Sequence, residues 1–364
     1  MRRRDFLANV AMLAGTGVCG LPGRGWAQSS LTSAGAAAGM HDWDWLVGGW
    51  TVWHRRLKER LVDDTRWEEF AGRSEVWSTL GGFGTIDDNI VELPGDTYRG
   101  LSIRAFDPSS GKWAIWWLDG RNPTHIDPPV RGGFERDTGT FVGHDTFKSK
   151  PITVRFRWRD IHGPRPWWEQ AFSPDDCAGW EVNWRNYFTR TSAQPSPLPR
   201  REDAPRDWDF LVGQWNVRHR RLRQRLVGNK DWDEFDGTLV NWPVLGGHGN
   251  VGDNVMHLPG ETVRGVSIRT LDPTTRQWSS WWLDTRTPAE IAAPLRGGFV
   301  GDTGRLAGDG SYEGRPVKTR VTWSRITERS ARWEQASSAN GGATWETNWI
   351  SEFRRRVSPD TSAQ

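Results

Sequence analysis

One string occurs twice in this chain, as "WTVWHRRLKERL" from Trp50 to Leu61 and as "WNVRHRRLRQRL" from Trp215 to Leu226. The first copy alone fits either a helix or a strand. Arg218 of the second copy stands where the helical stripe of the first copy needs Trp53. A strand presents every second residue on one face, and these residues are identical in the two copies. The alternating set is Trp50, Val52, His54 and Arg56 in the first copy and Trp215, Val217, His219 and Arg221 in the second. The string therefore predicts a strand with a constant inner face and a variable outer face.

The whole of each domain is repeated, not only this string. Laying each residue over the one 165 positions later aligns residues 42–190 with 207–355 without a gap, and about 70 of about 149 positions are identical. The length of 364 residues also suits two domains of ordinary size. The segment "TSAQPSPLPRREDAPR" suits a semi-rigid spacer. We therefore expect one domain at 42–190, a linker at 191–206 and a second domain at 207–356.

Turn motifs divide each copy into short extended segments. In the first copy they include "VDDTR", "LPGD", "DPSSGK", "RDTG" and "SPDDCAG", and no segment between them is typical of a helix. We expect strands near residues 50–61, 66–78, 84–93, 98–106, 112–119, 131–147, 151–161, 167–173 and 180–190. An antiparallel sheet of this many strands leaves no unpaired edge when it closes on itself. The predicted fold is all-β, with two tandem antiparallel up-and-down β-barrels joined by a proline-rich linker.

The start of each copy carries a short motif, Gly48-x-Trp50 in "LVGGW" and Gly213-x-Trp215 in "LVGQW". It resembles the G-x-W signature of lipocalins and their calycin relatives, and the whole unit is similar to a bacterial lipocalin-like family of unassigned function. The resemblance implies that the tryptophan plugs one end of the barrel and packs against an arginine of the last strand. Arg190 and Arg355 are in suitable places for that role. The usual lipocalin disulfide and C-terminal helix are missing, so membership in the vertebrate-type transporters is not implied.

The first residues are typical of an export signal. Arg3 and Arg4 precede an apolar stretch that resembles a twin-arginine leader, and cleavage after Ala27 is plausible. We expect a signal peptide at 1–27, a flexible segment at 28–41 and a disordered tail at 357–364. The apolar run is short and contains glycines, which disfavours a transmembrane helix and predicts no stable membrane insertion after signal removal. The predicted location is the periplasm or the medium.

The charge balance excludes one class of partner. Removing residues 1–27 changes the count of Lys and Arg against Asp and Glu from 48 and 45 to 44 and 44. A neutral mature chain exerts no general electrostatic attraction on nucleic acid. We therefore expect no nucleic-acid partner, and the sequence leaves the oligomeric state open.

Both copies share polar and aromatic residues that are candidates for the lining of a cavity, because a barrel of this size holds side chains and one small ligand. Guanidinium groups suit a carboxylate or phosphate, and indole faces suit flat or sugar-like rings. The predicted ligand-binding residues are Arg56, Arg104, Trp117, Arg121, Trp168, Gln170 and Trp184 in the first copy, and Arg221, Arg269, Trp282, Arg286, Trp333, Gln335 and Trp349 in the second. The alternative is structural, since buried carboxylates need partners and barrel arginines can supply them.

His54 is the candidate for proton transfer. Arg55 and Arg56 follow it in the sequence, and their charge would lower its pKa and keep the imidazole a neutral base near pH 7. Asp119 is its expected partner, and the second copy offers His219 with Asp284. The alternative is a packed, hydrogen-bonded histidine without a catalytic role.

Common cofactor and metal motifs are absent from the sequence. It contains no G-x-S-x-G, no H-E-x-x-H and no regular spacing of metal ligands. The runs "LGGFG" and "RGGF" precede no predicted helix and are expected to be turns or bulges instead of phosphate-binding loops. Two cysteines are too few for a Cys-rich zinc site. We predict no cofactor and no metal.

Three functions fit these observations. The first is an exported protein that binds a small amphipathic or aromatic molecule in Trp- and Arg-lined cavities. The second is an isomerase, cyclase or hydrolase of the same fold that uses the histidine and aspartate pairs. The third is an envelope module that binds glycan or protein. The copies also differ, as where His248 replaces Phe83, so either the two pockets bind different ligands, or one has become structural, or these positions have drifted.

Overall fold

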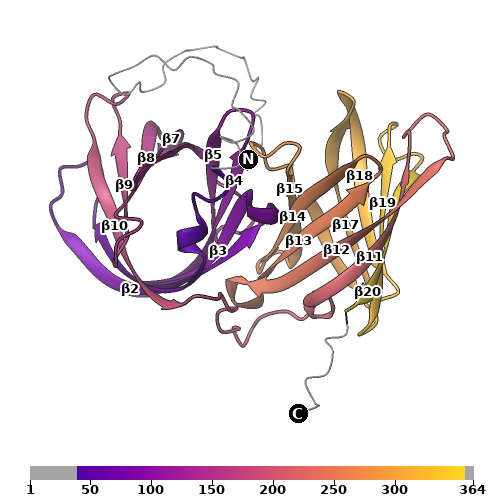
Figure 1. Cartoon of the computed structure of the whole chain (residues 1–364), viewed down its shortest axis with the longest axis horizontal. Helices are drawn as coiled ribbons and strands as arrows, with labels where there is room; N and C mark the ends of the chain where they lie inside the picture. Colours follow the sequence, from indigo (N-terminus) through magenta and orange to yellow (C-terminus); the bar gives the residue numbers. More distant parts are fainter. Residues whose placement is uncertain (1–38, 357–364) are drawn as a thin grey trace, which may run out of the picture.

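The computed structural model describes residues 39–356, which form two closed antiparallel barrels side by side (Figure 1). In the first barrel, β1 pairs with β2 on one side and with β10 on the other, so the sheet closes. Its strands are β1 (Gly48–Leu57), β2 (Trp67–Thr79), β3 (Gly84–Leu93), β4 (Asp96–Asp107), β5 (Lys112–Asp119), β6 (Val130–Glu135), β7 (Thr138–Phe147), β8 (Lys150–Arg159), β9 (Trp167–Ser173) and β10 (Glu181–Ser192).

The second barrel repeats this topology and closes through the pairing of β11 with β20. Its strands are β11 (Gly213–Leu222), β12 (Trp232–Val244), β13 (Gly249–Leu258), β14 (Glu261–Asp272), β15 (Gln277–Asp284), β16 (Leu295–Val300), β17 (Thr303–Tyr312), β18 (Arg315–Ser324), β19 (Ser330–Ser338) and β20 (Glu346–Arg355). The all-β class and the tandem of antiparallel barrels predicted from the sequence are confirmed. The predicted signal peptide, residues 28–38 of the expected flexible segment and the tail lie outside the described residues.

The string that opens each copy is a strand, as its alternation predicts. In β1, Trp50, Val52 and His54 are buried while Thr51 and Trp53 are exposed. Strand β11 follows the same pattern at the equivalent positions. In these two strands the constant residues of the string therefore face the interior, and the variable ones face the solvent.

The single strand expected at 131–147 is wrong, because this segment forms two strands. Strands β6 and β7 are an antiparallel hairpin in which Glu135 pairs with Thr138. The turn between them contains Arg136 at a φ of 55°, a left-handed conformation that residues other than glycine seldom adopt. The motif "RDTG" marks this turn, but Arg136 occupies a position where glycine would have made the reversal plain.

A tryptophan and an arginine close one end of each barrel. The guanidinium of Arg190 lies 4.1 Å from the ring centroid of Trp50, and one of its amino groups donates to Val47 O at 2.7 Å. Arg355 covers Trp215 at 4.3 Å in the second barrel. The pairing of a first-strand tryptophan with a last-strand arginine, which the G-x-W motif implies, is therefore confirmed in both copies. This closed end leaves the opposite end of each barrel as the mouth.

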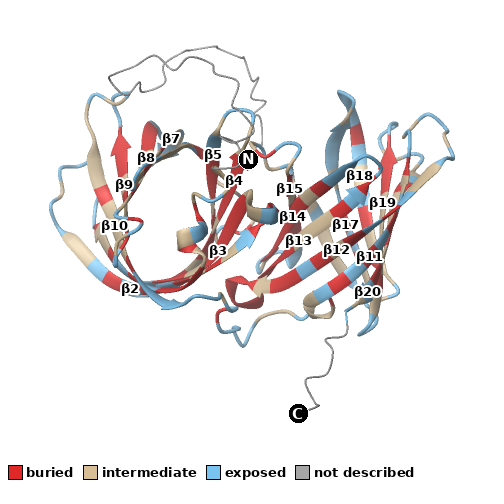
Figure 2. Cartoon of the chain, in the orientation of Figure 1, coloured by how far each residue is buried: buried red, intermediate tan, exposed pale blue. Residues whose placement is uncertain are grey.

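The barrels pack against each other through one side of each cylinder. The outer faces of β3, β4 and β5 share a hydrophobic cluster with those of β13, β14 and β15. Trp77 and Trp242 stack across the contact with centroids 5.5 Å apart. Strands β3, β4, β5, β13, β14 and β15 are therefore buried on both faces, and β2 and β12 join the contact through Trp77 and Trp242 (Figure 2).

Two backbone-to-carboxyl hydrogen bonds across this interface form an equivalent pair. Leu80 N donates to Asp253 Oδ1 at 3.2 Å, and Leu245 N donates to Asp88 Oδ1 at 3.2 Å. Leu245 is the second-copy equivalent of Leu80, and Asp253 is the equivalent of Asp88. Each barrel therefore contributes the same surface to the interface. The contact is isologous in the sense used for two-fold dimers.

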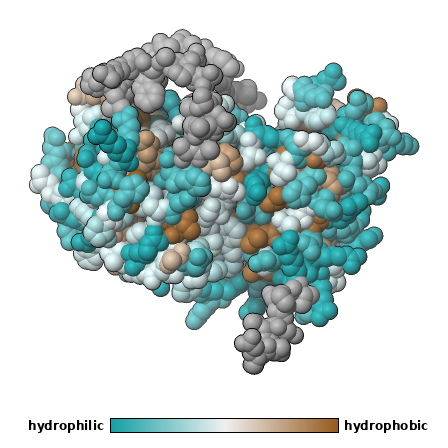
Figure 3. Space-filling view, in the orientation of Figure 1, coloured by the Kyte–Doolittle hydropathy of each residue, from teal (hydrophilic) through white to brown (hydrophobic). Residues whose placement is uncertain are grey.

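The outer surface is mainly hydrophilic, with scattered hydrophobic patches on the face shown in Figure 3. Between residues 39 and 356, no helix is long and apolar enough to span a membrane.

Candidate functional site

The first barrel encloses a cavity of about 340 Å³. All nine residues that the sequence predicts for the first copy line it: His54, Arg56, Arg104, Trp117, Asp119, Arg121, Trp168, Gln170 and Trp184. Their roles stay predictions, but the structure brings them to one cavity. The space suits one small molecule.

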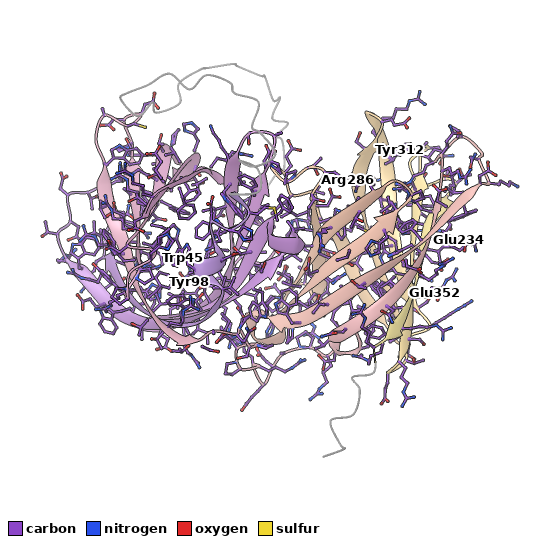
Figure 4. The ribbon with its side chains drawn as sticks, viewed as in Figure 1. Trp45, Tyr98, Glu234, Arg286, Tyr312 and Glu352 are labelled. Carbon is purple, nitrogen blue, oxygen red and sulfur yellow. The ribbon has the colours of Figure 1, made fainter. Side chains whose placement is uncertain are left out.

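The cavity runs from the closed end toward the mouth. The short helix η1 (Asp44–Leu46) and the buried Trp43 stand at the closed end, where Arg104 lies 4.6 Å from the Trp43 ring centroid. The mouth is the end at which β1, β5 and β7 finish. Figure 4 shows Trp45 and Tyr98 inside this barrel.

Aromatic rings form one wall of the cavity. Trp168 contacts Phe156 with centroids 5.0 Å apart, and it contacts Trp184 at 6.4 Å, both edge to face. Edge-to-face contacts fix the orientation of the rings. The wall therefore offers a rigid apolar surface to the body of a ligand.

His54 is held by its neighbours and does not contact Asp119. Its Nδ1 lies 2.7 Å from the Asn186 side-chain oxygen and 3.3 Å from Trp184 Nε1. The ring stacks on Phe70 with centroids 4.9 Å apart, and a Cβ at Gly72 would lie 2.4 Å from its Nε2. The expected pairing of His54 with Asp119 is not present, and the packed alternative describes the residue.

Burial is the main cause of the low pKa of His54. It lowers that pKa to about 4, and the charge of Arg56 lowers it by a smaller amount. The direction expected from the sequence is confirmed, although flanking charge is not the main cause. In the second barrel, burial lowers the pKa of His219 to about 4, and its Nδ1 lies 2.8 Å from Ser351 Oγ. A base this weak is mostly unsuited to proton abstraction near pH 7.

The two histidines predict a loss of stability in acid. An unfolded histidine binds a proton near pH 6.5, whereas His54 and His219 resist protonation until about pH 4, so each contribution is complete above 6.5 and is lost as the pH falls toward 4. We expect a loss of about 3 kcal/mol per histidine across this window. Urea unfolding of the wild type and of His54→Phe/His219→Phe at pH 7.0 and 4.5 measures it. An equal loss in both proteins would contradict the low pKa values.

Two of the predicted cavity arginines are already paired with carboxylates at the mouth. Arg56 Nε donates to Glu68 Oε1 at 2.9 Å, and its guanidinium lies 5.4 Å from the Trp184 ring centroid. Arg121 Nη2 donates to Asp119 Oδ2 at 2.6 Å. The structural alternative considered for these residues therefore describes their present contacts.

Arg104 and Asp87 form a buried ion pair deeper in the barrel. Arg104 Nη2 donates to Asp87 Oδ2 at 2.8 Å, and Nη1 donates to Thr85 Oγ1 at 3.3 Å. Both charged side chains are almost fully buried. A buried charge is tolerated when it is paired, so Asp87 compensates the guanidinium.

Two mouth residues escaped the sequence analysis. Asp127 and Asp145 line the cavity, and neither is paired with an arginine or lysine among the described residues. Burial, followed by the charge of Asp145, raises the pKa of Asp127 to about 6. The second copy has Ala292 and Gly310 at these positions, so a filter for shared residues discards them. A search for residues that face the interior and differ between the copies could have found Asp127 and Asp145.

The predicted residues of the second copy take equivalent places in the second barrel. Asp284 is bonded to Arg286 and to Trp282 Nε1 at 2.8 Å, and it makes no contact with His219. Trp333 contacts Trp349 edge to face at 6.2 Å. The other predicted residues of this barrel are Arg221, Arg269 and Gln335. Gln335 donates to Asn348 Oδ1 at 3.0 Å, and its first-copy equivalent Gln170 donates to Asn183 Oδ1 at the same distance.

No metal centre is formed by the residues described. Between positions 39 and 356, no three or more His, Cys, Asp or Glu side chains are placed to hold an ion together.

Comparison with protein-family models and with curated proteins finds no match. Among solved structures, the chain is similar to an S-type phycobiliprotein lyase from Guillardia theta, with 12% identity, 42% of this chain and 92% of that chain covered, and a TM-score of 0.30. It is also similar to a protein of unknown function from the DUF3598 family of Nostoc punctiforme, with 11% identity, 87% and 99% covered, and a TM-score of 0.25. Likenesses this distant support no inference about function.

Proposed function

We propose that the first barrel binds one small amphipathic or aromatic molecule. The observation that carries the proposal is the cavity of about 340 Å³, which the barrel's own side chains leave open. Its wall of indole and phenyl rings suits the apolar body of a ligand, and its charged groups suit a polar end. Export to the periplasm or the medium, supported by the twin-arginine sequence, is part of the same proposal.

Arg60 is the arginine available to the polar end of the ligand. Of the four arginines that line the cavity, the other three are paired with carboxylates, whereas Arg60 has no carboxylate within ion-pair distance among the described residues. Its guanidinium lies 4.9 Å from the Phe147 ring centroid, and its buried Nε has no hydrogen-bond partner among the described residues. Asp127 and Asp145 also line the cavity. A ligand with both donors and acceptors fits such a mouth.

The contacts of His54 and Asp119 argue for binding over acid-base catalysis. Each side chain is engaged by a neighbour, His54 by Asn186 and Asp119 by Arg121. The two groups that the enzymatic hypothesis needs together are thus held apart.

Filling the cavity tests the proposal. Val154 lines it, and Val154→Trp should remove one binding site for the neutral fluorescent probe N-phenyl-1-naphthylamine, because an indole occupies the space of the ligand. The measurement is a fluorescence titration of the full chain with the stoichiometry of bound probe. Native mass spectrometry of the protein from its own host would then identify a retained ligand.

The tandem supplies a matched control. Thr319 is the residue of the second barrel equivalent to Val154, and Thr319→Trp should leave the first-barrel site intact. Circular dichroism checks that both variants keep their strands. Probe binding by Val154→Trp with wild-type stoichiometry and affinity would reject a ligand site in the first barrel.

A further inference from the structure

The second barrel contains a buried arginine without a counter-ion. Arg269 is only 7% exposed, and among the described residues its guanidinium makes one hydrogen bond, from Nη1 to Asn250 Oδ1 at 2.8 Å. Its guanidinium lies 4.4 Å from the Trp208 ring centroid. No carboxylate among the described residues pairs with it. Arg104, its counterpart in the first barrel, is compensated by Asp87, and the residue equivalent to Asp87 is Gly252.

The loss of acidic groups extends along the whole lumen. The first cavity is lined by four arginines and four aspartates. At the equivalent positions the second copy keeps all four arginines but only Asp284, because glycine or alanine replaces the other three aspartates. Asp309, which replaces His144, is exposed and paired with Lys318 at 2.9 Å. The interior of the second barrel therefore has an excess of positive charge.

Two further arginines near the mouth of the second barrel are without carboxylate partners in the described chain. The guanidinium of Arg221 lies 5.5 Å from the Trp349 ring centroid, and Arg225 lies 5.6 Å from Tyr312. Asp233, which replaces the Glu68 partner of Arg56, is bonded to Arg223 instead. Burial and the charge of Arg221 lower the pKa of Arg225. Figure 4 shows Tyr312 and Arg286 toward the same end of this barrel.

Bulky lining residues of the first barrel become small in the second. Val321, Ser337 and Ser280 stand at the positions of Phe156, Phe172 and Ile115. These changes remove ring and branched-chain volume from the inner face. At these three positions the second barrel therefore has smaller side chains than the first, in addition to fewer acidic groups.

We propose that the second barrel binds an aromatic or amphipathic organic anion, with Arg269 as its deep anchor. A carboxylate, sulfonate or phosphate group supplies the charge that Asp87 supplies in the first barrel. A desolvated guanidinium gains more from a charge-assisted pair than from a neutral amide. This inference does not rest on ligand binding by the first barrel, and it makes the two barrels differ in the charge that they select.

Two probes that differ by one sulfonate test the proposal: 1-anilinonaphthalene-8-sulfonate, which is anionic, and neutral N-phenyl-1-naphthylamine. In the full chain carrying Val154→Trp, the anionic probe should bind at least about tenfold more tightly than the neutral one, because charged hydrogen bonds contribute more than the tenfold equivalent. Thr319→Trp should remove the second-barrel site for both probes. In that variant the first barrel should show no preference for the anion.

A graft of the first-barrel residues then isolates Arg269. The variant Leu239→Ser/Asn241→Val/Gly252→Asp copies Ser74, Val76 and Asp87 into the second barrel, and it replaces two of the three side chains that a Cβ at Gly252 would meet. The third, Ser267, is kept because the first barrel has Ser102 at the equivalent position beside Asp87. It should weaken the anionic probe at least about tenfold and the neutral probe by less than about twofold. Arg269→Met provides a second variant with the same expected loss. Equal weakening of both probes, or no change for the anionic probe in a folded variant, would overturn the proposal.

Discussion

Trp43→Ala is expected to lower the free energy of unfolding of the first barrel by about 3–5 kcal/mol, the range typical of a fully buried aromatic residue. Trp43 is only 1% exposed and lies within 6.1 Å of the rings of Trp113, Phe134, Phe141 and Trp158. Its removal leaves a cavity among four rings that cannot collapse without tilting one another. The measurement is urea unfolding of the full chain, followed by tryptophan fluorescence and circular dichroism.

The tandem and the protein surface both provide controls for Trp43→Ala. Trp208→Ala should destabilise the second barrel similarly, because Trp208 contacts Trp278, Phe299 and Trp323 in the same way. Trp53→Ala should cost clearly less than Trp43→Ala, since Trp53 is 42% exposed and Trp43 only 1%. A loss below about 1 kcal/mol for Trp43→Ala would mean that the closed end contributes little to the stability of the barrel.

The repeat made the fold predictable because it separates inner from outer residues. A single copy leaves the string at Trp50 ambiguous between helix and strand, and Arg218 resolves it. The resemblance to the G-x-W motif also placed Arg190 and Arg355 correctly. These predictions succeed since each depends on local backbone geometry or on one specific contact.

The packing between the barrels could not be derived from alternation. Leu101, Ile103 and Trp116 face outward from β4 and β5, yet the second barrel buries them. A strand buried on both faces has an almost continuous apolar pattern, and "WAIWWL" shows it, whereas "YRGLSIRAF" alternates apolar with polar residues. The pattern therefore indicates double burial for β5 but not for β4, and it does not identify the surface that buries either strand.

The candidate site was predictable in location but not in chemistry. A filter for shared residues favours those that both barrels need, and most of the selected arginines proved to be in structural ion pairs. Residues that distinguish the copies, such as Asp127 and Gly252, were discarded. Selecting residues that both copies share therefore favours structural roles and discards the residues that distinguish the two lumens.

The interface between the barrels holds two buried carboxyl groups that respond to pH. Burial raises the pKa of Asp88 to about 7, although the charge of Arg99, 3.6 Å away, opposes the shift. Burial also raises the pKa of Asp253 to about 6, partly offset by the bond from Leu80 N. Both carboxyls have unfolded pKa values near 3.8, so the folded chain holds more protons than the unfolded chain above that pH. The interface therefore loses stability as the pH rises from about 4 to 7.

The variant Asp88→Asn/Asp253→Asn is expected to be more stable than the wild type at pH 8, by up to about 4 kcal/mol for the change at Asp88 alone. An asparagine keeps the Oδ1 that accepts from the backbone N–H of Leu245 or Leu80, and it carries no charge to be desolvated. Near pH 4 the wild-type carboxyls are protonated in the folded chain, so the two proteins should differ little. Urea unfolding at pH 4.5 and 8.0 measures the difference.

Comparing both proteins at each pH removes the opposite contribution of the histidines, because His54 and His219 titrate identically in both. If Asp88→Asn/Asp253→Asn were the less stable protein at pH 8, Arg99 would be paired with an ionised Asp88 that holds the barrels together. The isologous contact would then depend on the charge of Asp88 instead of on neutral carboxyl groups.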